Sequence, residues 1–413
     1  MGGSKVTFPK KTIKDISVHG KTVLLRADFN VPLDDDGKID DDYRLTQTIP
    51  TLEYLIERDA KVVICTHLDK PHGKTDPKLS LEPVARRLGH LMDRHVAFVP
   101  ECIGDRVKQA VKHARPGQIL LLENLRFHIG EEENEAAFAQ RLFEASGASI
   151  FVQDAFGSVH RKHASTDAIT RFLPSVSGLL LKREYVTLRT AMQDPESPFV
   201  AILGGAKTSD KIQVIDELIR VADHIIIGGA MANTFLKYNG LNIGKSLYEL
   251  GMEKVIDSIY RDAAKKVGGK KSIGEFIVLP TDVAVSAEVD ESERRATVSV
   301  GDVKENDHIV DIGPETINRA ANLISQAKTV IWGGTLGVSE IDQFAVGSIE
   351  VAKQLVRQPD TTSIIGGGDT ADFVLHWDRK KGGSFTHVST GGSASLELMA
   401  GNKLPGIEAL LDA

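Results

Sequence analysis

The chain has 413 residues, of which 41% are hydrophobic and 26% charged, and its formal net charge is −7. This length favours two domains over one, and the acidic balance argues against a nucleic-acid binder, which carries a large basic surface. Two cysteines exclude a disulfide scaffold, and no stretch has the pattern of a signal peptide or a membrane span, so we expect a cytoplasmic protein without a membrane partner.

The first half of the chain alternates strand-like apolar runs with longer helix-like stretches. The runs are apolar throughout and rich in β-branched residues, so their strands should be buried on both faces. This pattern is typical of a parallel sheet covered by helices. The strand-like runs span residues 22–32, 61–71, 118–127 and 149–160.

Polar and cationic residues follow these strands. The carboxyl ends of parallel strands meet at one edge of a sheet, where ligands of such folds bind. Arginine binds phosphates and carboxylates through paired hydrogen bonds, so this edge is predicted to bind a small polyanion. Arg44 lies at the start of a helix that runs toward Pro50. The residues concerned are Asp28, Asn30, Arg44, His67, Lys70, Arg126, His160, Arg161 and His163.

A polar helix follows from about Leu181 and ends near Pro195 and Pro198. We interpret it as the connection between two domains, although a plain surface helix fits the pattern equally well. The expected boundaries are residues 1–182, 183–199 for the interdomain helix, and 200–395.

The strands of the second half end in glycines. Their apolar runs begin near residues 199, 224, 275, 329, 363 and 386. One glycine pair is usually only a tight turn, but backbone amides of glycines can also surround a phosphate. Glycines at five matching strand ends therefore predict a phosphate-binding edge: Gly204–Gly205, Gly228–Gly229, Gly333–Gly334, Gly366–Gly368 and Gly391–Gly392.

The stretch LGGAKTSDK places Lys207 and Lys211 before an amphipathic helix. Thr208 or Ser209 is the expected N-cap, which puts Lys211 in the first turn, where a cation opposes the helix dipole. A bound polyphosphate would explain both lysines. Asp369, directly after the triple glycine, predicts a bridging Mg²⁺, with helix capping as the alternative.

Several weaker motifs are rejected. Residues 366–371 fit a relaxed dinucleotide pattern but lack the acidic ribose partner, and residues 240–246 are one residue short of a P-loop. His160 and His163 lack cysteine companions at zinc spacing. No G-x-S-x-G elbow supports acyl-enzyme hydrolysis.

Taken in order, the motifs DFNVP, ENLRF, DAFG with HRKHAS, LGGAK-x-SDKI, DIGPET, GGGDT, STGG and the closing LPGIEAL resemble the phosphoglycerate kinase family along nearly the whole chain. The resemblance implies an α/β fold of two Rossmann-like three-layer (αβα) lobes with parallel sheets joined by a hinge helix, with residues from about 396 to 413 packing back on the N-terminal lobe. It implies reversible phosphoryl transfer between 1,3-bisphosphoglycerate and MgADP, giving 3-phosphoglycerate and MgATP, in a monomeric glycolytic enzyme.

The resemblance also assigns residues to roles. Phosphoglycerate binding falls to Asp28, Asn30, Arg44, His67, Lys70, Arg126 and Arg161. Nucleotide binding falls to Gly205, Lys207, Lys211, Gly228, Gly229, Glu340 for the ribose, Gly367, Gly368, Asp369 and Thr370, with Mg²⁺ on Asp369. The acceptor carboxylate is already ionised, so no general base is needed, and positioning with charge neutralisation remains. Arg44 and Lys207 are then the expected catalytic pair, assembled by hinge closure.

The chain departs from the usual family pattern at several positions. THLDKP stands where SHLGRP is usual, so Asp69 replaces a glycine and Lys70 an arginine. Other replacements fall around the expected nucleotide site, at Ala230, Ile309, Gly333, Thr335 and Ser393. Two hypotheses follow: an active kinase, and a non-catalytic descendant that binds a metabolite or a protein.

Overall fold

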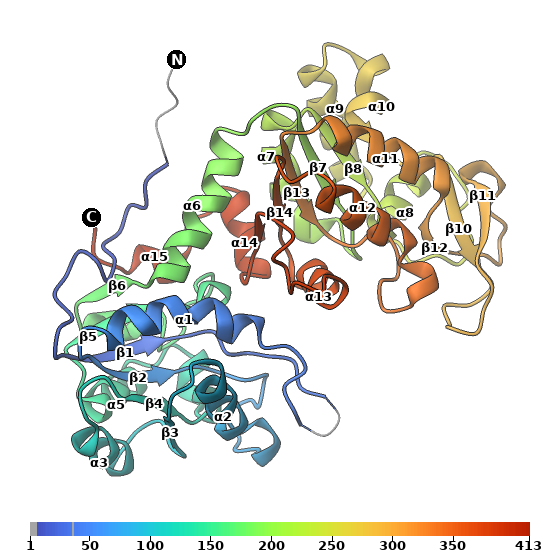
Figure 1. The fold of residues 1–413 in the computed structure, drawn as a ribbon. Helices are drawn as coiled ribbons and strands as arrows, with labels where there is room; N and C mark the ends of the chain where they lie inside the picture. Colours follow the sequence, from blue (N-terminus) through green and yellow to red (C-terminus); the bar gives the residue numbers. More distant parts are fainter. Residues whose placement is uncertain (1–5, 35–36) are drawn as a thin grey trace. The chain divides into compact units, whose positions relative to one another are not determined.

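The computed structural model describes residues 6–34 and 37–413, which form two compact units. The first unit comprises residues 7–186 together with 403–413, and the second comprises residues 187–402 (Figure 1). The division falls within helix α6 (Leu179–Gln193), the segment that the sequence predicted as the interdomain helix. Each unit has its own sheet and its own buried core.

A six-stranded sheet with the order β3-β4-β2-β1-β5-β6 forms the centre of the first unit, and every pairing is parallel. The predicted parallel sheet is thus confirmed. All residues of β4 and β5 are buried, as continuous apolar strands require. The strands are β1 (Thr22–Arg26), β2 (Lys61–Cys65), β3 (Val96–Val99), β4 (Ile119–Leu122), β5 (Ile150–Gln153) and β6 (Ser175–Ser177).

Alternate residues of these strands belong to two separate cores, one on each face of the sheet. Leu25 and Ile64 share a core with residues of α1 (Tyr43–Ile56) and α2 (Glu82–Leu91). Leu24 and Val63 share the other core with residues of α3 (Asp105–His113) and α5 (Ala136–Ser146). Figure 1 shows α1 across the sheet from α3 and α5. The unit therefore has the predicted three layers.

The C-terminal segment of the chain packs within the first unit. Helix α15 (Pro405–Glu408) brings Gly406 against Val159, and the Leu411 amide donates to the carbonyl of Ser175. Helix α14 (Ser393–Met399) instead packs on α7 (Ile212–Val221) in the second unit. The segment that returns to the first unit starts at Lys403.

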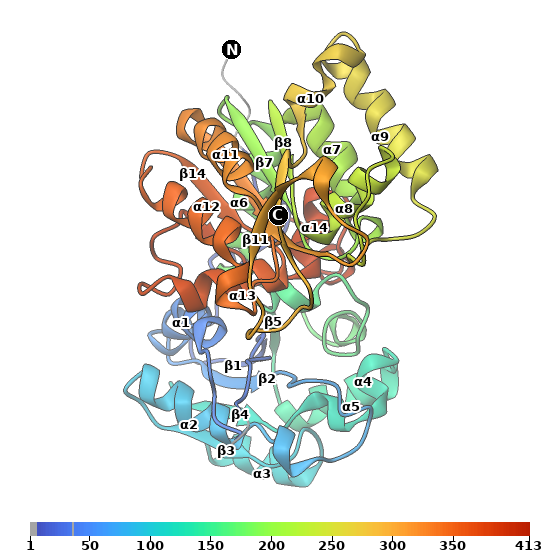
Figure 2. The ribbon, with the colours of Figure 1, turned by 90° about the vertical axis from the view of Figure 1, so that its right-hand side faces the viewer.

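The second unit contains a six-stranded parallel sheet with the order β15-β14-β13-β7-β8-β9. Figure 2 shows α7 and α8 on one side of β7 and β8, with α11 and α12 on the other. The strands are β7 (Phe199–Leu203), β8 (His224–Ile227), β9 (Ile277–Val278), β13 (Thr329–Gly333), β14 (Thr362–Ile365) and β15 (His387–Val388). The remaining helices are α8 (Gly229–Tyr238), α9 (Glu253–Lys266), α10 (Ile273–Phe276), α11 (Pro314–Gln326), α12 (Val346–Val356) and α13 (Gly368–Trp377).

A three-stranded antiparallel sheet adds to the second unit, which the prediction of parallel sheets alone did not include. It consists of β10 (Asp282–Ser286), flanked by β11 (Ala296–Ser299) and β12 (His308–Ile312). The run from residue 275 splits between β9 and β10 near Pro280, because a proline cannot donate to a sheet ladder. Strand β11 is largely exposed, so its sequence lacks the apolar signal of the other strands.

The start of one helix and the extent of another differ from the sequence prediction. Helix α7 begins at Ile212, after a 3₁₀ turn over Ser209–Lys211, so its N-cap is Lys211 rather than Thr208 or Ser209. The side chain of Thr208 is buried and makes no hydrogen bond with the described residues. Helix α1 continues through Pro50, because Leu45, Leu52 and Leu55 anchor it on both sides of the missing hydrogen bond.

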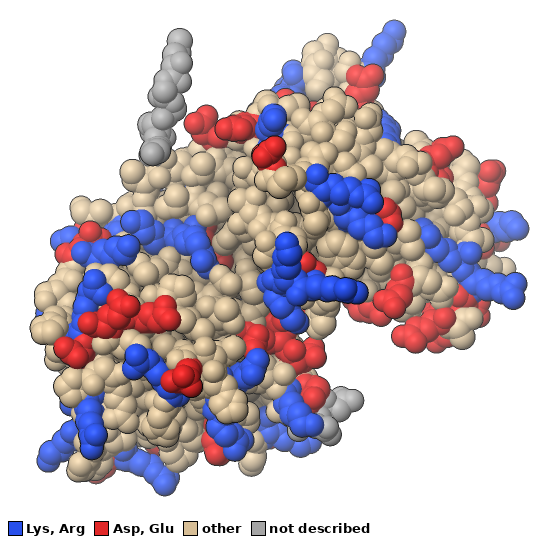
Figure 3. All heavy atoms as spheres, in the orientation of Figure 1, with Lys and Arg blue, Asp and Glu red and all other residues tan. Residues whose placement is uncertain are grey.

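The surface mixes both signs of charge. On the face drawn in Figure 3, Lys and Arg side chains are interspersed with Asp and Glu over each unit. Among the helices of the described residues, none combines the length and apolarity needed to cross a membrane.

Candidate active site

In the first unit, polar residues gather beyond the ends of β4, β2, β1 and β5, which are consecutive in the sheet. At their centre lies Arg26, the last residue of β1, which is fully buried. Its guanidinium donates to Ser165 Oγ at 2.7 Å and to the Ala27 carbonyl, and it lies 3.0 Å from His67 Nδ1. A buried cation thus fixes the imidazole of His67.

Two further arginines are held in place around this centre. Arg44, in the first turn of α1, donates to Asp28 at 2.5 Å, and the Asp28 carboxylate is buried. Arg126, also buried, donates to the backbone carbonyl of Asp69 at 2.7 Å, while the Asp69 amide donates to Asn30 Oδ1 at 2.8 Å. The backbone of Asp69 therefore links Arg126 to Asn30.

The two buried histidines of this pocket are held neutral. Burial, followed by the charges of Arg26 and Arg126, lowers the pKa of His67 well below its usual value and lowers the pKa of His163 to about 3. His163 Nδ1 is buried and has no hydrogen-bond partner among the described residues. Because Arg26 and Arg126 disfavour protonation of these imidazoles, the electrostatic potential around them is positive. Such a potential favours the binding of an anion.

The structure separates the predicted residues of this pocket into fixed and exposed groups. Asp28, Asn30, Arg44, His67 and Arg126 make the contacts above. Lys70 and Arg161 are exposed, and Arg161 donates to His160 at 3.1 Å.

Sequence reasoning missed Arg26 and the buried Glu131, which accepts from Ser165 Oγ at 2.6 Å. An arginine inside an otherwise apolar strand was the signal that could have identified Arg26.

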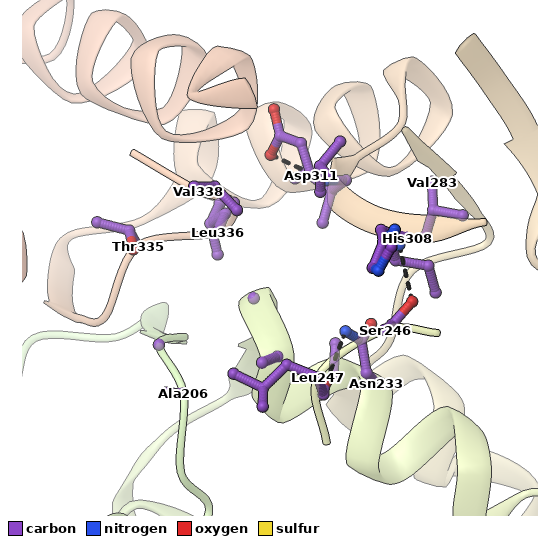
Figure 4. A pocket seen from close by; sticks show the side chains of 18 of the residues that line it. Ala206, Asn233, Ser246, Leu247, Val283, His308, Asp311, Thr335, Leu336 and Val338 are labelled. Atoms are coloured by element: carbon purple, nitrogen blue, oxygen red, sulfur yellow. Dashed lines mark hydrogen bonds between the residues drawn. The ribbon is translucent and has the colours of Figure 1, made fainter. Parts of the chain in front are cut away.

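The second unit contains a partly open cavity of about 310 Å³. Apolar side chains form its walls, and the carboxylates of Asp311, Glu340 and Asp369 border it. Figure 4 shows the two walls of this cavity, with Thr335, Leu336 and Val338 on one side and Ala206, Asn233, Ser246 and Leu247 on the other. A cavity of this size and apolar lining suits a flat organic group.

Asn233 lines this cavity, but its side-chain oxygen is buried. Its Nδ2 donates to the Leu247 carbonyl at 3.0 Å, and its Oδ1 has no hydrogen-bond partner among the described residues. A carbonyl can only accept, so the amide nitrogen faces Leu247 and the oxygen faces the other way.

A second, more polar cleft of about 810 Å³ adjoins the cavity, because Gly205 and Asp369 line both. Lys211, Gly367, Gly368 and Thr370 also line the cleft. Burial lowers the pKa of Lys211, whereas the negative charges of Asp210 and Asp369 oppose that shift. The cleft therefore combines glycines, whose backbone amides can approach an anion, with a half-buried lysine.

The strand-end glycines fall into two groups. A Cβ on Gly204 would lie 2.0 Å from the carbonyl oxygen of Thr335, and one on Gly334 would lie 2.3 Å from the backbone of Gly204. By contrast, a Cβ on Gly368 would meet nothing within 4 Å. Gly204 and Gly334 therefore allow two backbone segments to pack closely. Beside Gly368, the space that a side chain would fill is open to the cleft.

The other predicted residues occupy different positions. Gly228 packs against Leu336, and Gly229 lines the cavity. Glu340 is exposed at the cavity. Lys207 is exposed and lines neither the cavity nor the cleft.

The chemistry at the junction of cavity and cleft fits a magnesium ion. Asp369 provides a carboxylate oxygen there, at the start of α13. Magnesium in nucleotide sites is held by one or two carboxylates together with phosphate oxygens and water. One carboxylate beside a cleft lined by backbone amides and a lysine satisfies this requirement.

Comparison with known proteins gives one consistent result. The family model for phosphoglycerate kinase matches residues 13–402. The phosphoglycerate kinase of Koribacter versatilis is 44% identical over 409 residues, covering 97% of this chain and 99% of the relative, and that of Chlorobium chlorochromatii is 45% identical over 406 residues, with the same coverage. Solved phosphoglycerate kinase structures from Coxiella burnetii (36% identity, TM-score 0.81) and Pyrococcus horikoshii (31%, TM-score 0.82) each cover 97% of this chain and 98% of their own. None of these similarities favours the non-catalytic hypothesis.

Proposed function

Because this chain belongs to the phosphoglycerate kinase family, and is therefore a phosphotransferase with a carboxyl group as acceptor, we propose that its first unit binds 3-phosphoglycerate or 1,3-bisphosphoglycerate and its second binds an adenine nucleotide with Mg²⁺. The observation that carries this assignment is the adjoining cavity and cleft, joined at Gly205 and Asp369. One compartment suits a base and its sugar, and the other suits phosphates.

In the first unit, Arg44, Arg126 and the exposed Arg161 bind the charged groups of the phosphoglycerate. Asp28 holds Arg44, and Asn30 holds the backbone of Asp69, so both act by positioning. His67 is neutral and donates a hydrogen bond without adding charge. The carboxylate acceptor is already ionised near neutral pH, so this chemistry requires no proton to be removed.

In the second unit, the base lies in the cavity, the ribose at Glu340 and the phosphates along the cleft with Lys211, Gly367, Gly368 and Thr370. Asp369 would hold Mg²⁺, which, when bound with the nucleotide, offsets the charge of the phosphate oxygens. The exposed Lys207 binds the phosphoryl group that is transferred. Arg44 supplies the matching charge from the phosphoglycerate side.

We also propose that the enzyme acts as a cytoplasmic monomer. Both cysteines, Cys65 and Cys102, are free and buried, as expected for a reducing compartment. Sedimentation at micromolar concentration tests the oligomeric state.

The test measures binding of each substrate separately by calorimetry, next to a coupled turnover assay with 3-phosphoglycerate and MgATP. Arg126→Ala should weaken 3-phosphoglycerate binding about 10- to 100-fold and leave nucleotide binding unchanged, because it removes charge-assisted hydrogen bonds from one unit only. Lys211→Ala should do the reverse. Both variants should lose turnover.

Two matched controls accompany these variants. Arg87→Ala removes an exposed arginine of the first unit that pairs with Asp42, and Lys254→Ala removes an exposed lysine of α9. Neither should alter binding or turnover. If Arg126→Ala and its control bind 3-phosphoglycerate equally well, the assignment of the first pocket is wrong.

A further inference from the structure

A second cluster of ligand-type side chains lies in the first unit, outside the contacts described above. Glu101 and Cys102 follow β3, and His128 lies between the 3₁₀ turn Leu125–Phe127 and helix α4 (Ile129–Glu132). One carboxylate oxygen, the sulfur and one ring nitrogen of these residues all lie within 4.8 Å of one another. The cluster thus brings together three different donor atoms from two chain segments.

The geometry of the cluster is close to that of a tetrahedral metal site. Zinc bonds of about 2.0–2.3 Å at tetrahedral angles place neighbouring ligand atoms roughly 3.3–3.6 Å apart. The distance from His128 Nε2 to Glu101 Oε1 is 3.2 Å, so this edge is already formed. The sulfur of Cys102 lies within 4.8 Å of both of these atoms, so metal binding requires it to move only slightly closer to them.

Burial and exposure are distributed as such a site requires. Cys102 is fully buried, while the side chains of His128 and Glu101 are 29% and 41% exposed. An ion can therefore enter from solvent on the side of His128 and Glu101, and a water molecule can complete the coordination. The sulfur would form the buried corner of the site.

The charges around the sulfur favour a cation. The carboxylates of Glu101 and Glu123 both act electrostatically on Cys102. Glu123 is held in place by hydrogen bonds from Ser80 Oγ at 2.8 Å and from the amide of Leu81 at 2.9 Å, so its position beside the cluster is fixed. The Cys102 thiol donates to the Glu123 carbonyl at 2.8 Å, and this proton is the one that a metal would replace.

We propose that Glu101, Cys102 and His128 bind one divalent transition-metal ion, with Zn²⁺ as the best fit to a thiolate, imidazole and carboxylate donor set. Binding replaces the thiol proton: the S–H bond breaks, the sulfur–metal bond forms, and one proton passes to solvent. The ion keeps its oxidation state, so no other reactant takes part. The site lies two residues from Arg126, so an ion on His128 would restrain the turn that carries this arginine.

Cobalt substitution tests the proposal directly. Co²⁺ added to the metal-free full-length protein should give the absorption of a tetrahedral ion and a thiolate-to-cobalt charge-transfer band, at one ion per chain. Cys102→Ser should abolish the charge-transfer band. His128→Ala and Glu101→Gln should each weaken Zn²⁺ binding at least tenfold in competition with a chromophoric chelator.

Matched variants separate this site from adventitious binding. His113→Ala removes an exposed histidine of α3, and Cys65→Ser removes the other buried thiol. Both should keep the full cobalt spectrum, and circular dichroism establishes that all variants are folded. The proposal is overturned if the wild-type protein shows no thiolate band, or if Cys102→Ser and Cys65→Ser reduce the band equally.

Discussion

The two candidate half-sites present their positive charges by different physical means. In the first unit, the pocket is made of side chains, and Arg26, Arg44 and Arg126 are each held by a specific hydrogen bond. In the second unit, several glycines line the cleft together with Lys211, a half-buried cation, whereas Lys207 is exposed and does not line it.

This difference indicates what each half-site tolerates. A group of cations that are each fixed by a specific partner is preorganised, so removing one charge leaves that partner unpaired. A cleft of open glycines has few partners to disturb, but it depends on the space that a Cβ would fill. Loss of charge should therefore impair the first half-site most, and added volume the second.

Arg44→Ala should cause the largest effect. Without this guanidinium, the transition state loses the cation proposed to face the transferred phosphoryl group from the phosphoglycerate side, so we expect kcat to fall by about 10²- to 10³-fold. Lys207→Ala should give a fall of similar size, even though this lysine is exposed. Steady-state kinetics in both directions measure these losses.

A double variant controls for the buried partner of Arg44. Removing Arg44 leaves the Asp28 carboxylate buried and unpaired, which lowers stability for a reason unrelated to catalysis. Arg44→Ala combined with Asp28→Asn should recover stability in urea denaturation but not turnover. Recovery of turnover would show that Arg44 matters only as a structural partner.

The glycine groups can be distinguished by adding one methyl group to each. Gly204→Ala should destabilise the second unit by roughly 3 kcal/mol or more, because its Cβ would lie 2.0 Å from the Thr335 carbonyl oxygen. Gly368→Ala should leave stability nearly unchanged while raising the KM for ATP about tenfold, since its methyl enters open space at the cleft. Thermal unfolding and nucleotide KM are the two measurements.

The opposite result would overturn the division of the glycines. If Gly368→Ala unfolds the protein and Gly204→Ala leaves it stable, the contacts that separate the two groups do not govern their roles. If Gly368→Ala changes neither quantity, the nucleotide does not approach the start of α13.

The pocket histidines make the stability of the first unit depend on pH. The folded pKa of His163, about 3, lies below its unfolded value near 6.5, so the unfolded chain takes up a proton first and stability falls as pH drops below about 6.5. Between pH 7 and pH 5, we expect the wild type to lose roughly 1–2 kcal/mol more than His163→Gln. Urea denaturation at several pH values measures this difference.

Another buried group of the same unit acts in the opposite direction. Burial raises the pKa of Asp154 from 3.8 to about 6, so its contribution to stability is lost as pH rises through this range. The comparison of wild type with His163→Gln cancels this contribution, because both proteins contain Asp154. Saturating 3-phosphoglycerate should shrink the difference, since a bound anion favours the protonated imidazole. Parallel pH curves for the two proteins without ligand would contradict the neutral state of His163.

The fold was predictable because its strands are apolar throughout and end in residues that buried strands exclude. Leu24 and Leu25 point to opposite cores, and a run without alternation is the direct signature of that arrangement. The antiparallel sheet escaped prediction because β11 is exposed and only weakly apolar. The start of α7 escaped it because Thr208 has the residue type of an N-cap, yet its hydroxyl is buried and caps no backbone amide.

The candidate site was predictable only in part. Motif order assigned Asp369 and Lys211, which the structure brings to one cleft. It could not show that Gly204 serves packing whereas Gly368 faces open space, because that depends on a loop 130 residues away in the chain. Nor could it identify Arg26 or Glu131, whose roles arise from contacts across the sheet edge.

Asp69 offers the smallest and most discriminating test, because two effects oppose each other there. Its backbone has a φ of 52°, which glycine adopts more easily than aspartate, so Asp69→Gly relieves strain in the folded state. The same change adds freedom to the unfolded chain, which lowers stability by about 0.4–1 kcal/mol. The two contributions are similar in size, so stability should change by less than about 0.5 kcal/mol.

The charge of Asp69 should matter more than its backbone, because this residue is linked to Arg126 and Asn30 of the proposed phosphoglycerate site. Asp69→Asn keeps a side chain that tolerates the same backbone conformation while removing the charge, so both variants should lower the KM for 3-phosphoglycerate by about two- to threefold, as expected for a screened charge near the surface. If only Asp69→Gly lowers the KM, the backbone that joins Asn30 to Arg126 limits binding. If only Asp69→Asn lowers the KM, the glycine has made the backbone between Asn30 and Arg126 less rigid. This loss of rigidity then offsets the tighter binding expected from removal of the charge. Comparison of the two variants therefore measures how much of the preorganisation of the first half-site depends on this one residue.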